Sequence, residues 1–159
     1  MKKIFPLLPA SLLLLALTGQ LEALEKKPLE AGSFTSLKNS VQQTAGSDQK
    51  QVVKDAKLSE GSTVDVGAGS CAEMTFTDSS VMRVGQNSRF SFDSKERRIR
   101  LDKGTVLIHA KPGNGGISVQ GSDVIGTVSG STVLASSDGK GNFSFAVLES
   151  DGGNGQISN

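Results

Sequence analysis

His109 is the only histidine in this 159-residue sequence, and so the only unperturbed side chain suited to general-base chemistry near neutral pH. A hydrolase would also need an activated nucleophile and an acidic side chain that orients the imidazole. Serines are frequent, but none lies in the G-x-S-x-G sequence that presents a nucleophile on a sharp turn. His109 shares a strand face with Leu107, and because it lacks such partners we interpret it as a surface or half-buried structural residue. A serine hydrolase that uses His109 is the weaker alternative.

The single cysteine, Cys71, excludes an internal disulfide and, with only one histidine, a zinc site built from several such ligands. Cys71 falls on the polar side of a predicted strand, in register with Glu73 and Thr75. In an oxidising compartment an exposed thiol is reactive and can join two chains. Two interpretations stay open: a reactive thiol, or a small apolar side chain beneath a neighbouring loop.

Two short patterns resemble cofactor or metal sites. The stretch Gly67–Ala72 fits G-x-G-x-x-A, but a dinucleotide site requires a helix there, and the residues that follow alternate as a strand. Asp138, Lys140 and Asn142 occupy alternate positions, as in a calcium loop. However, a lysine stands where an oxygen ligand is needed, and no bidentate glutamate follows. We interpret both patterns as tight turns, and the sequence predicts no cofactor and no metal.

The charge balance excludes partners that require a strongly basic surface. Lys and Arg number 17 against 16 Asp and Glu, so there is no electrostatic basis for binding nucleic acid. The densest basic cluster is Arg97, Arg98 and Arg100, and acidic residues interleave with it. We therefore expect a solvated strand edge at this cluster, protected against aggregation, rather than a ligand site.

The N-terminal segment has the features of a secretory signal peptide. Lys2 and Lys3 precede the apolar run Ile4–Leu17, which is shorter than the ~20 residues of a spanning helix. A retained membrane anchor is the weaker reading. We assign residues 1–23 to the signal peptide, with cleavage between about 18 and 23, and residues 24–32 to a polar leader. The expected location is periplasmic or secreted, without stable membrane insertion after cleavage.

From Ser33 onward, apolar and polar residues alternate with the period of β-strands. Turn-forming residues separate these stretches at roughly 8–12-residue intervals. This pattern predicts an all-β domain over residues 33–150, rolled or solenoid-like, with about ten short strands. A β-sandwich is the alternative. The expected buried residues are Val64, Val66, Ala72, Met74, Phe76, Met82, Val84, Phe90, Phe92, Ile99, Leu101, Val106, Ile108, Phe143 and Phe145.

Several motifs resemble those of the FecR-type domain. Ser70–Ser80 is similar to the family's "S-x-a-e-l-x-f-x-D-G-s" stretch, and Arg83–Ser88 to its "R-l-G-x-n-S" turn. Ile99–Gly104 resembles "v-x-L-x-x-G", and Val124–Thr132 a later element of the family. The resemblance spans about residues 33–150. It implies a non-catalytic domain like those of periplasmic regulators that relay the state of an outer-membrane iron transporter to a sigma factor.

Three features depart from that family. Its sensory regulators carry a cytoplasmic segment and a membrane helix ahead of this domain, whereas here we expect the domain to follow a signal peptide directly. Asp78-Ser79 replaces the usual Asp-Gly, which is expected to alter that turn. After Leu148-Glu149 the sequence becomes polar, so we expect residues 151–159 to form a disordered tail in place of a closing strand.

These observations predict an exported, non-catalytic module that binds a protein or polysaccharide of the cell envelope, with a role in signalling. The strand Phe143–Leu148 carries Phe143, Phe145, Val147 and Leu148 without Pro or Lys, so it is the candidate partner-binding edge and a candidate for self-association. The alternative interpretation is that the chain is a structural fragment truncated at its C-terminus. The sequence does not identify the partner.

Overall fold

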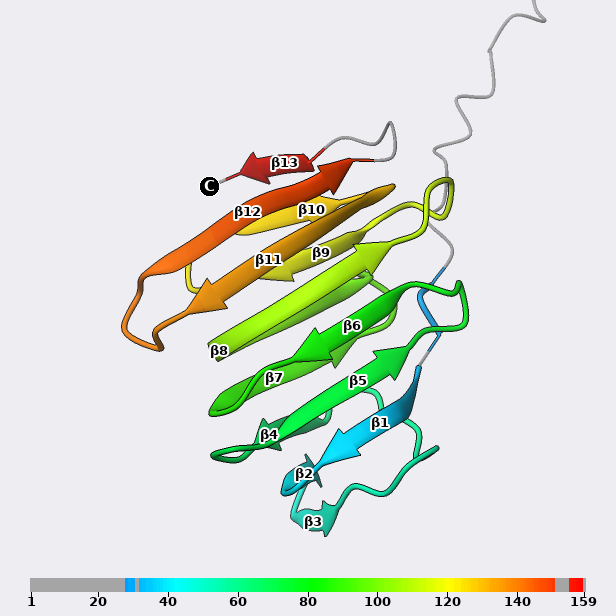
Figure 1. Ribbon diagram of the computed structural model, residues 1–159, viewed down its shortest axis with the longest axis vertical. Helices are drawn as coiled ribbons and strands as arrows, with labels where there is room; N and C mark the ends of the chain where they lie inside the picture. The colour runs from blue at the N-terminus through cyan, green and yellow to red at the C-terminus, as the bar shows by residue number, and fades with distance from the viewer. Residues whose placement is uncertain (1–27, 31, 151–154, 159) are drawn as a thin grey trace, which may run out of the picture.

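The computed structural model describes residues 28–30, 32–150 and 155–158 (Figure 1). The predicted signal peptide lies outside these residues, as does most of the leader. The described residues form strands and no helix, which confirms the all-β class. The strands are β1 (Ser33–Lys38), β2 (Val41–Ala45), β3 (Asp48–Gln51), β4 (Thr63–Val66), β5 (Cys71–Thr75), β6 (Val81–Val84), β7 (Ser88–Asp93), β8 (Arg98–Ala110), β9 (Ile117–Gln120), β10 (Ile125–Val128), β11 (Ser131–Ser137), β12 (Phe143–Ser150) and β13 (Gly155–Ser158).

The thirteen strands form one continuous sheet that is rolled into two facing layers (Figure 1). We call the layer with strand order β1-β5-β6-β8-β11-β12 sheet A. The layer with order β3-β2-β4-β7-β8-β9-β10-β13 is sheet B. The parallel pair β8–β9 is the exception in a mostly antiparallel arrangement. The rolled form expected from the sequence is therefore confirmed.

Strand β8 belongs to both sheets. Its first half pairs with β7 and β9, and its second half pairs with β6 and β11. Ile99 and Leu101 point into the core in the first half, whereas Val106 and Ile108 do so in the second half. In a regular strand the inward-facing residues are all odd-numbered or all even-numbered, so the change from odd to even numbers requires a bulge. The register against β7 does shift by one residue just before Gly104.

Gly104 makes that bulge possible because its backbone has φ of +96° and approaches Ser88 of β7 closely. A Cβ atom at position 104 would lie 2.1 Å from Ser88 Oγ, a contact that no side chain can accommodate. Any larger residue would therefore conflict with both the backbone conformation and the packing.

The core lies between the two sheets. Phe76, which follows β5, contacts Phe92 of β7 across the layers, with ring centroids 5.5 Å apart. Of the fifteen residues expected to be buried, all are buried except Phe143 and Phe145, which are half-buried. That expectation was wrong because β12 is the last described strand of sheet A, and no other strand in the described part of the chain covers them. Leu29, assigned to the polar leader, is buried, and its N–H donates to the Ser94 carbonyl at 2.9 Å.

The expected disordered tail is also corrected in part. Residues 155–158 form β13, which pairs antiparallel with β10 from Ile125↔Ser158 to Val128↔Gly155. The prediction of disorder depended only on the burial of side chains, whereas main-chain pairing to an open strand also orders a polar segment. The remaining tail residues, 151–154 and 159, lie outside the described part of the chain.

Candidate functional site

The candidate edge strand β12 pairs with β11 on one side, and no other described strand pairs with it (Figure 1). The pairing runs from Ser131↔Ser150 to Ser137↔Phe143, with a register shift between Thr132 and Val133. Near this irregularity Val147 and Leu148 are 48% and 59% exposed. The outer edge of β12 therefore offers unpaired main-chain groups beside apolar side chains.

Two phenylalanines anchor the start of β12 against sheet B. A Cβ at Gly126 of β10 would lie 2.3 Å from the Phe145 ring, and one at Gly121 would lie 2.5 Å from the Phe143 ring. Because neither glycine has a side chain, the rings pack directly against the backbone of sheet B. The four candidate edge residues therefore divide into two anchors, Phe143 and Phe145, and two exposed residues, Val147 and Leu148.

The edges formed by β1 and β3 are protected in ways that β12 is not. The segment after β3 covers β1, since Phe34 N–H donates to the Ala56 carbonyl at 3.0 Å and Asp55 N–H donates to the Phe34 carbonyl at 2.8 Å. Strand β3 is short, with sequence DQKQ, and its side chains are exposed, polar and in part charged. By comparison β12 has eight residues with sequence FSFAVLES.

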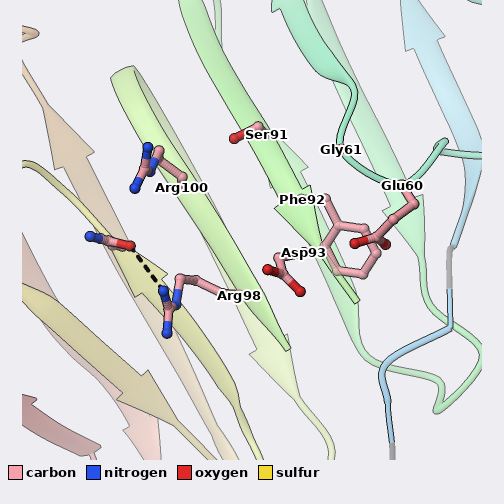
Figure 2. A pocket seen from close by; sticks show the side chains of 8 residues that line it. Glu60, Gly61, Ser91, Phe92, Asp93, Arg98 and Arg100 are labelled. Carbon is pink, nitrogen blue, oxygen red and sulfur yellow. Dashed lines mark hydrogen bonds between the residues drawn. The ribbon is translucent and has the colours of Figure 1, made fainter. Parts of the chain in front are cut away.

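A groove of about 230 Å³ lies on the outer face of sheet B (Figure 2). Arg98 and Arg100 of β8 extend to one side of the groove, while Asp93 and Glu60 lie on the other. Ser91 and Gln120 also line it. This site was not predicted from the sequence, although the spacing of Arg98 and Arg100 places both on the same face of a strand.

Arg97 does not belong with the other two arginines. It is 3% exposed, its Nη2 donates to Asp78 Oδ2 at 2.7 Å, and its Nε donates to the Gly116 carbonyl at 2.6 Å. The expectation of a solvated edge is therefore wrong for this residue. Asp78 stands 19 residues away in the sequence, so the alternation of charged and apolar residues around Arg97 does not reveal this ion pair.

His109 is half-buried beside Thr132, with its Nδ1 3.0 Å from Thr132 Oγ1. A shallow groove of about 290 Å³ includes both residues together with Val81, Arg83 and Leu107. This lining contains no serine and no carboxylate, the partners that a serine hydrolase using His109 would need.

The remaining candidates occupy strands and turns. Cys71 is exposed at the start of β5, so of its two interpretations the accessible thiol fits the structure. The turn before it contains Gly69 with φ of +62°, and a strand follows, not the helix of a dinucleotide site. Asp138 lies in the β11–β12 turn; hydrogen bonds from the Lys140 N–H and the Asn142 side chain lower the pKa of its carboxyl.

Within the described residues, no group of three His, Cys, Asp or Glu side chains is placed to hold a metal ion. The same part of the chain contains no helix with the length and apolar character needed to cross a membrane. On the outer face of sheet A, Arg83 Nε donates to Glu73 Oε2 at 2.7 Å, and this hydrogen bond lowers the pKa of Glu73.

The motifs that resemble the FecR-type domain hold the crossing of the two sheets together. Asn87, in the turn between β6 and β7, has φ of +56°, a conformation that asparagine tolerates well. Ser88 is buried, and its Oγ accepts the Thr105 N–H at 3.0 Å, beside Gly104. Asp78 Oδ1 accepts the Ser80 N–H at 2.8 Å while its other oxygen binds Arg97. These motif residues are structural.

The rolled, mostly antiparallel all-β fold with this set of turns defines a small β-domain. The profile of the FecR protein family matches residues 62–151, more than half of the sequence, and the chain belongs to the FecR family. The match starts just before β4, so β1, β2 and β3 lie outside it. Comparisons with curated proteins and with solved structures give no significant match.

Proposed function

We propose that this chain is a non-catalytic, exported module of the cell envelope that binds another protein by accepting a β-strand at β12. Membership of the FecR family supports a regulatory domain in the periplasm or outside the cell. The groove at His109 is lined without a serine or a carboxylate, which is consistent with a role in binding.

The observation that carries this proposal is the uncovered edge of β12. No described strand pairs with the outer edge of this eight-residue strand, which contains no Pro, Lys or Arg, and Val147 and Leu148 add exposed apolar surface. Natural proteins usually protect such an edge with charge, proline or a covering loop, as this chain does at β1 and β3. An added strand would form main-chain hydrogen bonds and bury these side chains.

Strand addition can be tested with the protein alone, because β12 of one copy can pair antiparallel with β12 of a second copy about a two-fold axis. Light scattering at rising protein concentration, with a reductant present so that Cys71 cannot join two chains, measures this pairing. Val147→Lys should keep the protein monomeric, because a lysine on the edge opposes pairing.

Val53→Lys is the matched control, since Val53 is also an exposed valine, at 65%, but lies outside the strands. It should associate like the unsubstituted protein. A monomeric mass for all three proteins at high concentration, or equal association of the Val147→Lys variant, would contradict pairing at β12.

A further inference from the structure

The groove on the outer face of sheet B contains two arginines, Arg98 and Arg100. Neither has the short ion pair with a carboxylate that the other described arginines form. Among the described arginines, Arg83, Arg89 and Arg97 each have a carboxylate oxygen at 2.7 Å. Arg98 reaches Glu96 Oε2 and Gln120 Oε1 only at 3.4 Å, beyond the usual range for such bonds. Arg100 is exposed and forms no hydrogen bond or ion pair with any described residue.

Arg98 also has an unsatisfied donor. Its Nε is buried and has no hydrogen-bond partner among the described residues, which is uncommon in folded proteins. Arg98 and Arg100 stand two residues apart on β8, so both guanidinium groups lie over one face of the sheet (Figure 2). Two planar guanidinium groups on one face of a sheet can bind a carboxylate or another oxyanion through several N–H donors.

The opposite side of the groove restricts the kind of anion. Glu60 and Asp93 would repel a ligand that carries several charges close together, such as a polyphosphate. Both carboxylates already accept backbone N–H groups, from Ser94 and Glu96 respectively, which fixes their position. They and the side chains of Ser91 and Gln120 can bind hydroxyl groups.

We infer that this groove binds an acidic saccharide, with the sugar carboxylate on Arg98 and Arg100 and its hydroxyls on the polar side chains opposite. The volume of about 230 Å³ lies below that of pockets for drug-sized molecules and suits one sugar unit of a chain that continues along the surface. This inference is independent of strand addition at β12, which lies in the other sheet.

Calorimetric titration with trigalacturonate tests the inference, with maltotriose as a ligand of equal ring number that lacks carboxylates. Trigalacturonate should bind the unsubstituted protein, and Arg100→Gln and Arg98→Gln should each weaken binding about tenfold or more. Arg83→Gln, which removes an exposed charge from sheet A, should leave the affinity within about twofold, since that charge is distant and screened.

Any of the following results would overturn the inference. Binding of trigalacturonate could be absent at millimolar concentration, or maltotriose could bind equally well, or Arg83→Gln could weaken binding as much as Arg100→Gln. Tripolyphosphate separates saccharide recognition from simple charge attraction, and tighter binding of tripolyphosphate than of trigalacturonate would also contradict it. Circular dichroism of each variant confirms that it has folded.

Discussion

Ser79 holds a backbone conformation that its side chain disfavours. Its φ is +68°, in the turn between β5 and β6, where Ser79 N–H donates to the Phe76 carbonyl at 2.9 Å. From the sequence, the replacement of the family's glycine was expected to alter this turn. The structure instead keeps the left-handed conformation that glycine favours, so the serine bears a conformational cost.

Ser79→Gly should therefore stabilise the protein. Relief of the left-handed conformation contributes about 1–2 kcal/mol, and the greater freedom of glycine in the unfolded chain offsets about 0.4–1 kcal/mol of it. A net gain of about 1 kcal/mol corresponds to a rise of a few degrees in Tm, measurable by thermal denaturation. Ser79→Ala is the control and should give no gain, because alanine retains the Cβ. Equal stability of Ser79→Gly and the unsubstituted protein would show that this turn is unstrained.

The buried pair Arg97–Asp78 joins the β7–β8 turn to the turn after β5. Asp78 is 12% exposed and Arg97 is 3% exposed, so removal of the arginine leaves a buried carboxylate without its partner. Arg97→Met should lower the free energy of unfolding by about 3–5 kcal/mol. Denaturant titration measures this loss. Arg83→Met removes an ion pair with the same N–O distance, but its arginine is 65% exposed. This variant should lower the free energy of unfolding by less than about 1 kcal/mol. Similar losses in both variants would contradict the importance of burial here.

At the scale of the element, alternation of apolar residues predicted the strands well. The stretch with Ala72, Met74 and Phe76 on one face lies in and just after β5, and all three residues are buried. Local alternation depends only on which side of a strand faces the core, so it is visible in the sequence. It does not reveal which strands pair, and the continuity of β8 through both sheets, with its bulge at Gly104, was not predicted.

The position of β12 depends on two glycines of sheet B, another feature that local sequence patterns do not reveal. Gly126→Ala should push the Phe145 ring away from β10 and destabilise the protein by about 1–3 kcal/mol. Chemical denaturation measures the effect. Gly85→Ala is a suitable control because its new Cβ would meet Thr105 at an ordinary 3.6 Å. If both substitutions have the same small effect, Phe145 is free to move and does not anchor β12.

For the whole molecule, the roll leaves the two sheets unequal at their ends. Sheet B continues beyond β9 through β10 to β13, whereas sheet A ends at β12. This inequality explains why Phe143 and Phe145 are only half-buried and why Val147 remains exposed. The sequence identified this strand as the candidate edge because its composition lacks the usual protective residues. The groove on sheet B was missed because Glu60, Asp93, Arg98 and Gln120 meet only once β7, β8 and β9 have paired.

Amide hydrogen exchange of β12, compared between dilute and concentrated protein, tests the central claim most directly. Strand addition requires main-chain hydrogen bonds on the outer edge, so the β12 amides that do not bond to β11 should exchange more slowly as the protein associates. The edge amides of β3 serve as an internal reference and should remain fast. Association that leaves the exchange of all β12 amides unchanged would contradict pairing at this edge.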